Sequence, residues 1–282
     1  MSLPLGRLGR SVSAAAVFFA PAAFGAEDGP IMPGTERFTV MLGAFLPAFK
    51  TKVEVDGDQA GGDRIDLGRD LGTDQNSSGG WFALEWRFAP RHRFGFTYSR
   101  FTLNGDRRAE RDLHIGDKVF PIGAEVQSRL RLELIPITYS YSVIKQPQNE
   151  LALTAGVHWD RLTFRVDASA SIGGRSGSNE ASSKANLPLP LLGVRYDHHF
   201  SERWSMGASA AAFSLKFAEE TFSFEGSLVS ARLHGEYRMT HHLALGAALD
   251  AFKVNAKASQ SDWHGGMDYG YFGPQVYLTA RF

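Results

Sequence analysis

The 282-residue chain contains no cysteine, no excess of either charge and no long apolar run. Without cysteine it has no disulfide, no thiolate metal site, no cysteine nucleophile and no lipid anchor on an N-terminal cysteine. Basic residues number 30 and acidic residues number 30. This balance argues against a nucleic-acid binder, which needs a basic excess or a basic face. No later stretch reaches the roughly 18 apolar residues of a transmembrane helix, so none is predicted.

The first 25 residues have the order of a secretory signal. Arg7 and Arg10 precede an apolar stretch over residues 12–20, and small residues follow up to Gly25 and Ala26. The apolar stretch is too short to span a bilayer, which takes about 20 residues. We therefore predict a signal peptide over residues 1–25, cleaved after Gly25 or Ala26, and a short periplasmic segment over 26–35. The alternative is a buried N-terminal helix, although such a helix would usually show a polar face.

The rest of the chain alternates between large apolar residues and small or polar ones with a period of two, as over 81–88, 93–99, 151–160 and 242–250. This pattern predicts strands, and they are long, at about ten residues or more, where soluble strands average about five or six. The opposite face carries glycine, serine and charge, which suits a polar lumen rather than a dry core. Aromatic residues gather near the turns, as in a membrane-interface girdle: Trp86, Phe88, Phe94, Tyr139, Tyr141, Phe200, Trp204 and Tyr237.

A sheet in lipid must close on itself, because an open edge would leave backbone groups unpaired. We therefore predict an all-β fold, a closed antiparallel transmembrane β-barrel over residues 36–282. Short polar turns at 90–92, 145–149, 201–203 and 240–241 alternate with longer breaks near 54–79, 104–121, 169–184, 218–225 and 258–267, as periplasmic turns alternate with external loops. Ten strands result, and eight or twelve stay open: 36–52, 79–89, 93–104, 123–144, 150–167, 185–200, 203–217, 224–239, 242–257 and 268–282.

The C-terminal strand carries the most specific pattern. It ends in Phe282, preceded on the same face by Ala280, Leu278, Val276 and Phe272, with Gly273 in between. A glycine, alternating hydrophobic residues and a terminal aromatic resemble the insertion signal of Gram-negative outer-membrane barrels. The resemblance implies that the barrel assembly machinery recognises this strand.

Residues 65–72, 86–93 and 116–126 resemble a group of largely uncharacterised bacterial outer-membrane β-barrel proteins, loosely similar to small porin-like and OmpA-type barrels. The resemblance covers most of 36–282. It implies the outer membrane of a Gram-negative bacterium, with membrane lipid and lipopolysaccharide as surroundings. Its motifs mark topology rather than chemistry, so it assigns no active residue.

Charged residues recur at positions that we predict to face the lumen. Both signs occur on most strands, which is typical either of a polar pathway that selects charge or of a narrow lumen plugged by ion pairs; a ten-stranded barrel favours the plug. The predicted ladder comprises Glu85, Arg87, Arg129, Arg131, Glu133, His158, Asp160, Arg195, Asp197, Arg232, His234, Glu236, Arg238, Asp250 and Arg281.

Neither metal binding nor a cofactor is predicted. His198–His199 and His241–His242 are neighbours on strands, so the two members of each pair point to opposite faces and do not chelate together. The acidic segment 56–72 lacks the ordered ligand spacing of a calcium loop.

The function expected first is a porin-like or structural barrel, monomeric, that passes or binds small solutes at most weakly. An alternative is a surface hydrolase with carboxylates and a histidine at the outer rim, for which the nearest residues are Asp262, His264, Asp160, Asp167, Glu219 and Glu220. No spacing matches a catalytic motif. A second alternative is ligand binding or adhesion by the loops, among them the Ser/Gly-rich stretch 169–183.

Overall fold

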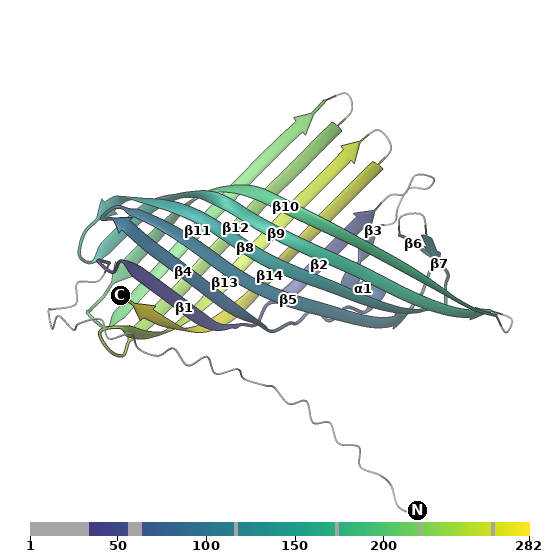
Figure 1. Ribbon diagram of the computed structural model, residues 1–282, viewed down its shortest axis with the longest axis horizontal. Helices are drawn as coiled ribbons and strands as arrows, with labels where there is room; N and C mark the ends of the chain where they lie inside the picture. Colours follow the sequence, from purple (N-terminus) through teal and green to yellow (C-terminus); the bar gives the residue numbers. More distant parts are fainter. Residues whose placement is uncertain (1–33, 56–63, 116–117, 173–174, 220–221, 261–262) are drawn as a thin grey trace, which may run out of the picture. The chain divides into compact units, whose positions relative to one another are not determined.

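The computed structural model describes residues 34–55, 64–115, 118–172, 175–219, 222–260 and 263–282. These residues form strands and one short helix (Figure 1), and no helix among them is long and apolar enough to cross a bilayer. The elements are β1 (Phe38–Phe45), β2 (Ala48–Val55), β3 (Arg64–Asp66), α1 (Leu67–Leu71), β4 (Gly79–Ala89), β5 (His92–Arg108), β6 (Leu113–Ile115), β7 (Lys118–Phe120), β8 (Glu125–Lys145), β9 (Asn149–Ile172), β10 (Arg175–His199), β11 (Trp204–Ala218), β12 (Phe222–Arg238), β13 (Leu243–Gln260) and β14 (Trp263–Arg281).

Hydrogen bonding closes the main sheet into a ring. Twelve strands follow the order β1-β4-β5-β8-β9-β10-β11-β12-β13-β14-β2-β3, and β1 also pairs with β14, from Thr39 opposite Arg281 to Phe45 opposite Gln275. All these pairings are antiparallel, and β6 and β7 form a separate hairpin. The all-β, antiparallel and closed character that the alternation predicts is therefore present.

The first predicted strand, 36–52, is interrupted. β1 and β2 pair with successive parts of β14, and Leu46 and Pro47 separate them. Pro47 has no N–H to give to the ladder, which favours a break at this point. Gly273 of β14 lies opposite: a Cβ there would lie 2.5 Å from the Leu46 oxygen and 2.6 Å from the Pro47 Cα. The glycine is required because the backbones approach closely.

The predicted loop 54–79 contains ordered structure. Helix α1 begins after Asp66, whose side chain accepts a hydrogen bond from the Arg69 N–H (3.1 Å), and it ends at Gly72, whose φ of 62° suits glycine. Leu67 and Leu71 of α1 are buried in the barrel core.

The same segment completes the wall between β2 and β5. Asn76 bridges to Ala48 on one side, and Thr73 bridges to Gly105 on the other. β4 begins only at Gly79, so the stretch around α1 takes its place at this height of the barrel.

The prediction of a loop over 169–184 is wrong for most of these residues, because they lie in strands. β9 and β10 continue as a paired hairpin, from Lys184 opposite Thr163 to Arg175 opposite Ile172. Composition alone suggests a flexible loop, but pairing with a neighbouring strand overrides local propensity. The predicted loops at 104–121, 218–225 and 258–267 are also shortened by strands that extend further than expected.

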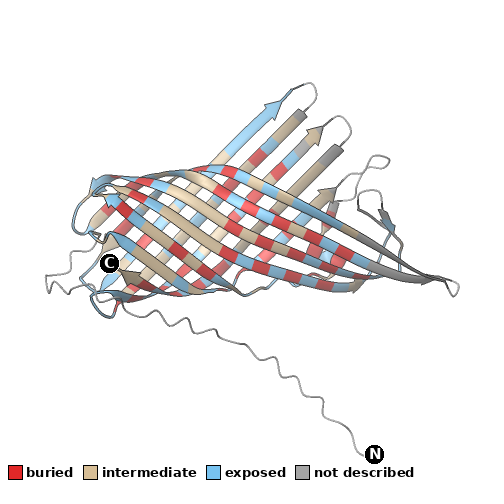
Figure 2. Ribbon diagram, viewed as in Figure 1, coloured by how far each residue is buried: buried red, intermediate tan, exposed pale blue. Residues whose placement is uncertain are grey.

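The two ends of the barrel differ. The four predicted short turns lie at one end, where the Arg37 N–H also donates to the Phe282 oxygen (2.7 Å); we call this the turn end and the other the loop end. Exposed and buried residues alternate along the strands (Figure 2). The apolar outer face includes the aromatic residues predicted for the girdle, of which Trp86, Phe94 and Trp204 are exposed. Val276, Leu278 and Phe282 of the predicted assembly signal are exposed on this face too, whereas Gly273 faces inward.

The lumen changes character along its length, which the sequence interpretation missed. Toward the turn end, the inward residues are charged or hydroxylic. Toward the loop end, they are apolar and closely packed, and they form the core of the molecule. The predicted polar lumen is therefore present only in the half of the barrel nearer the turn end, which we call the turn half. The half nearer the loop end, the loop half, has an apolar core instead.

Candidate functional site: a polar chamber in the lumen

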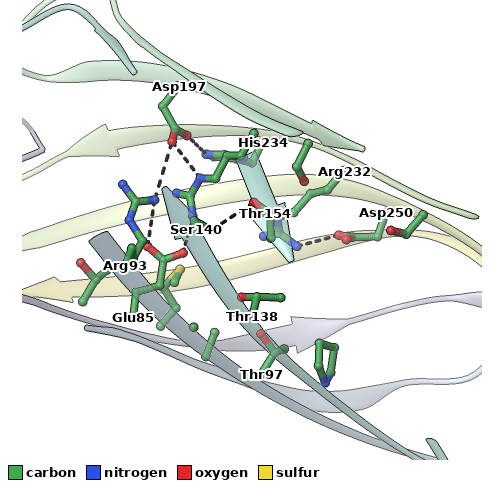
Figure 3. Close-up of a pocket in the computed structure, with 18 of the residues that line it drawn as sticks. Glu85, Arg93, Thr97, Thr138, Ser140, Thr154, Asp197, Arg232, His234 and Asp250 are labelled. Atoms are coloured by element: carbon green, nitrogen blue, oxygen red, sulfur yellow. Dashed lines mark hydrogen bonds and ion pairs between the residues drawn. The ribbon is translucent and has the colours of Figure 1, made fainter. Parts of the chain in front are cut away.

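A cavity of about 310 Å³ occupies the turn half of the lumen. Every strand of the ring from β1 to β14, other than β2, contributes inward-facing residues to it. Much of the lining is hydroxylic, including Thr97, Thr138, Ser140 and Thr154 (Figure 3). We call this cavity the chamber.

The lining carries six arginines and six carboxylates. They are Arg87, Arg93, Arg195, Arg232, Arg238 and Arg281, with Glu36, Glu85, Glu150, Asp197, Glu236 and Asp250. The signs balance, whereas a pore that selects by charge uses rings of one sign. Balanced pairing is what a low-dielectric interior requires.

The largest ion network joins strands on opposite sides of the chamber. Glu150 accepts two hydrogen bonds from the Arg87 guanidinium (3.0 and 2.9 Å) and one from Arg93 (3.1 Å). Arg93 also lies 3.4 Å from Glu85. The pairs are almost fully enclosed, because the side chains of Arg87 and Glu150 are 7% and 6% exposed.

The network continues through Arg195 on β10. Arg195 donates to Glu85, and its Nε donates to Asp197 (2.8 Å). Asp197 also lies 3.4 Å from the Nε2 of His234 on β12. Three carboxylates and three guanidinium groups, together with His234, thus tie β4, β5, β9, β10 and β12 together across the lumen.

A second cluster lies at the turn end. Glu36, just before β1, accepts a hydrogen bond from Arg238 (2.7 Å), and Arg281 pairs with Glu236. Burial raises the pKa of Glu36, but a backbone hydrogen bond and the charges of Arg281 and Arg238 lower it more, so the net pKa lies below its ordinary value. This cluster holds the first residues of the barrel to its last strand.

A third cluster lies deeper. Arg232 donates to Asp250 (2.8 Å) and to the side-chain oxygen of Gln275 (2.6 Å). Its guanidinium also stacks over the ring of Trp81, 4.9 Å from the centroid.

The inner boundary of the chamber is formed by a histidine and aromatic rings. His158 Nδ1 lies 2.6 Å from Asp160, and its ring stacks on Phe252 at 4.5 Å. Asp160 is fully buried and also accepts a hydrogen bond from Tyr269. Two donors therefore satisfy a carboxylate that has no access to water.

Beyond this boundary an apolar layer fills the cross-section. Its members are at most 4% exposed and come from strands around the ring: Phe49, Phe101, Leu132, Leu162, Leu189, Leu228 and Val254. Phe49 and Phe101 meet edge to face at 5.2 Å, and the Phe45 ring packs against Phe101 at 5.4 Å. We call this the closing layer. Its near-zero exposure means that side chains, not water, fill the lumen at this height.

Twelve of the fifteen predicted ladder residues face the lumen, where they form the clusters above. Arg129, Arg131 and Glu133 do not: they lie on the outer face of β8, and the inward residues there are Leu130, Leu132 and Leu134. The prediction for these three is corrected. In the loop half the outside of the strand is charged and the lumen is apolar, which reverses the order that holds nearer the turns.

The sequence reasoning missed several site residues. Arg93 and Glu150 anchor the main network, and Glu36, Gln275 and Tyr269 complete the other clusters. Arg93 alternates with Phe94 and Phe96 on β5, so its face could have been inferred. Glu36 and Tyr269 carry no comparable signal, because their partners are distant in the sequence.

The rim residues of the hydrolase alternative are not brought together by the part of the chain that is described. Asp160 is buried in the core rather than at the rim, Asp167 and Glu219 are exposed, and Asp262, Glu220 and the His264 side chain lie outside the described residues. In the acidic segment, Asp66 caps α1 and Asp70 pairs with Arg69 (3.0 Å), while residues 56–63 are not described.

The two histidine pairs differ: His198 and His199 lie on β10 with their side chains on opposite faces, whereas His241 and His242 lie in the turn between β12 and β13 and not on a strand, contrary to the prediction. His199 lines the chamber, whereas the His198 ring packs against Phe200 and its Nδ1 donates a hydrogen bond to the Asn149 Oδ1 (2.8 Å). Within the described ranges, no group of three or more potential ligands could hold a metal ion. The residues 1–33 of the predicted signal and of most of the periplasmic segment fall outside the described part.

The fold is that of closed, antiparallel outer-membrane β-barrels. The outer membrane protease OmpT from Escherichia coli is similar over 87% of this chain and 97% of its own, with 13% identity and a TM-score of 0.56. The translocator domain of the autotransporter NalP from Neisseria meningitidis (14% identity, 90% and 91% coverage, TM-score 0.43) and the Pseudomonas putida toluene transporter TodX (11% identity, 90% and 93% coverage, TM-score 0.37) are more distant. No family model matches the sequence, and no curated protein matches it.

Proposed function

We propose that the chain is a monomeric outer-membrane barrel that binds small polar solutes in the chamber at most weakly and does not conduct them across the membrane. The closing layer carries this proposal, because it fills the lumen with apolar side chains between the chamber and the loop end. Of the two forms expected from the sequence, a porin-like channel and a structural barrel, this favours the closed one.

Several features support a membrane location. Large apolar side chains are exposed around the outer face, among them Leu192 (66%), Leu42 (52%) and Leu278 (54%). Exposure of this extent is costly in water and favourable in lipid. The pairing of both β1 and β2 with β14 supports counting them as one membrane-spanning position, and we propose on this basis a barrel of ten spanning positions.

The proposal includes an orientation. The short turns face the periplasm, the long hairpins face outward among lipopolysaccharide, and the signal peptide of residues 1–25 is removed after export. The barrel assembly machinery recognises the C-terminal strand. In this orientation the chamber opens to the periplasm.

Thiol labelling of single-cysteine variants tests the one-sided chamber, because the chain has no cysteine of its own. Ser209→Cys places a thiol in the chamber, and Ala218→Cys places one on the exposed outer face at the loop end of the same strand. Both variants are reconstituted in vesicles and treated with a small, charged thiol reagent on the outside only.

We expect the labelled fractions of the two variants to add up to one. Molecules inserted with the loop end outward expose the Ala218→Cys thiol and protect the chamber thiol, and molecules inserted the other way do the reverse. In a preparation in which Ala218→Cys shows that the loop end of most molecules faces outward, labelling of Ser209→Cys in an equal or larger fraction of molecules would mean that the chamber is reached through the loop end. That result would reject the closed lumen.

A further inference from the structure

The wall of the barrel is split between β10 and β11 toward the loop end. The two strands pair only from His199 opposite Ser205 to Leu192 opposite Ala212. Beyond that point residues 175–191 of β10 pair with β9 and residues 213–218 of β11 pair with β12. Over the described ranges, no pairing joins the two strands there, and β10 runs away from β11 in Figure 1.

Two prolines explain where the ladder stops. Pro188 and Pro190 have no N–H to donate, and because they are two residues apart their missing donors fall on the same side of β10. The β9 ladder continues past both, with Pro188 opposite Trp159 and Pro190 opposite Val157. The missing donors therefore lie on the β11 side, and they begin two residues beyond the last β10–β11 pair.

Apolar surface runs through the split. On the outer face of β10, Pro188 and Pro190 are exposed and continue the row of Leu192 and Val194, which are 66% and 47% exposed. This row belongs to the apolar outer face of the barrel. The β10 side of the split therefore starts at the height of the membrane band.

The inner side of the split is apolar and accessible as well. Leu215 and Phe217 lie on the lumen side of β11, and each is 45% exposed. Phe224 of β12 lies opposite Phe217, and Leu187 of β10 is half-buried. Elsewhere among the side chains that the structure describes, the large inward ones on the barrel strands are packed into the core, so within that set the accessible apolar wall lies at the split.

We propose that this split is a lateral doorway through which an acyl chain of a lipid in the surrounding leaflet enters the barrel mouth and lies against Leu215 and Phe217. An acyl chain suits this site because the surface is apolar from the outer row of β10 to the lumen side of β11. Lys184, exposed on the outer face of β10 beside the split, offers a charge to an anionic headgroup. The doorway goes beyond the chamber and depends only on the barrel lying in a membrane.

Photo-cross-linking tests the doorway in nanodiscs that contain phosphatidylglycerol with a diazirine in its acyl chain. After irradiation, the cross-linked peptides are identified by mass spectrometry. In the unmodified protein we expect labels on Leu215 or Phe217, together with labels on outer-face residues such as Leu278, which report that the barrel is embedded.

Two variants close the doorway. The double variant Pro190→Cys/Ser214→Cys permits a disulfide at positions that would oppose each other if the register of Leu192 and Ala212 continued. Pro188→Thr/Pro190→Thr restores the missing N–H donors and lets the ladder extend. The matched control is Val194→Cys/Ala210→Cys, a cross-link within the existing ladder, where Val194 already opposes Ala210.

Either closed variant is expected to lose the labels on Leu215 and Phe217 and to keep those on Leu278, while the control keeps both. If the unmodified protein carries no label on Leu215 or Phe217 although Leu278 is labelled, the doorway does not admit lipid. If the labels on Leu215 and Phe217 persist in Pro188→Thr/Pro190→Thr and in the oxidised double-cysteine variant, the acyl chain reaches the inner wall by another route. Either result overturns the proposal.

Discussion

Glu150 pairs with two of the buried arginines in the chamber. It accepts hydrogen bonds from Arg87, Arg93 and the Ser142 hydroxyl (2.5 Å). Both arginines are at most about one-tenth exposed, so without this carboxylate their charges would lie in the lumen without full compensation. The network therefore joins several strands across the lumen, and its ion pairs depend on one another because they share residues.

Replacing Glu150 is therefore expected to be costly. Glu150→Gln keeps the shape and removes the charge, and we expect it to lower the free energy of unfolding by about 3–5 kcal/mol, as for a broken buried pair. Urea unfolding followed by tryptophan fluorescence measures this.

The matched control is Glu125→Gln, because Glu125 pairs with Arg108 at 3.6 Å while both side chains are at least 70% exposed. An exposed pair of this kind contributes about 0–1 kcal/mol. If Glu150→Gln lowered the free energy of unfolding by no more than the control does, the network would not stabilise the barrel.

Glu36 gives the barrel a pH-dependent contribution to stability. Its pKa in the folded protein lies below the ordinary value of 4.5, so the ionised carboxylate stabilises the fold. That stability is fully present above about pH 4.5 and is lost as the pH falls through the lowered pKa. The wild type should therefore exceed Glu36→Gln in free energy of unfolding at neutral pH, and the difference should shrink on acidification. Unfolding curves at several pH values measure it; a difference that grows as the pH falls would contradict the assignment.

At the scale of the element, β8 shows why alternation alone could not place every site residue. A period of two identifies two faces but does not say which is inward. Near the turns the outward face is apolar, and this rule assigns Arg195 and Asp197 correctly. Further along β8 the strand leaves the apolar band, so Arg129 and Arg131 face outward and Leu130 and Leu132 face the core. The sequence carries no marker of the height at which this reversal occurs.

Local composition also misjudges the strand ends. Ser- and Gly-rich stretches at the loop end are paired with neighbouring strands, so loop predictions based on composition are too long. The turns near 90, 146, 201 and 240 are predicted well, because short polar breaks between long apolar strands leave few alternatives.

The packing of β14 against the break between β1 and β2 depends on Gly273, where the two backbones approach closely. We expect Gly273→Ala to destabilise the barrel by about 1–3 kcal/mol, the usual cost of forcing a side chain into packed space. Gly266→Ala on the same strand is the control, since a Cβ there would come no closer than 3.7 Å to its neighbours. Heat-modifiable gel mobility and urea unfolding report the folded fraction and its stability. Equal effects of the two substitutions would mean that the close approach at Leu46 and Pro47 has no role.

At the scale of the whole molecule, the barrel is organised in two halves. The turn half has an apolar outside and a polar inside, whereas the loop half has a charged outside and an apolar inside. The closed antiparallel wall follows from the strand pattern and could be predicted from the sequence. The closing layer could not, because it brings together single residues from strands far apart in the chain, such as Phe49, Leu132 and Val254.

The closing layer is expected to block the lumen to ions. Single-channel recording of purified, refolded protein in a planar bilayer tests this most directly, with the gel mobility shift confirming that the barrel is folded. We predict a folded protein that inserts without conducting ions. Steady, reproducible conductance from the unmodified protein would contradict the closing layer and the closed-barrel function that rests on it.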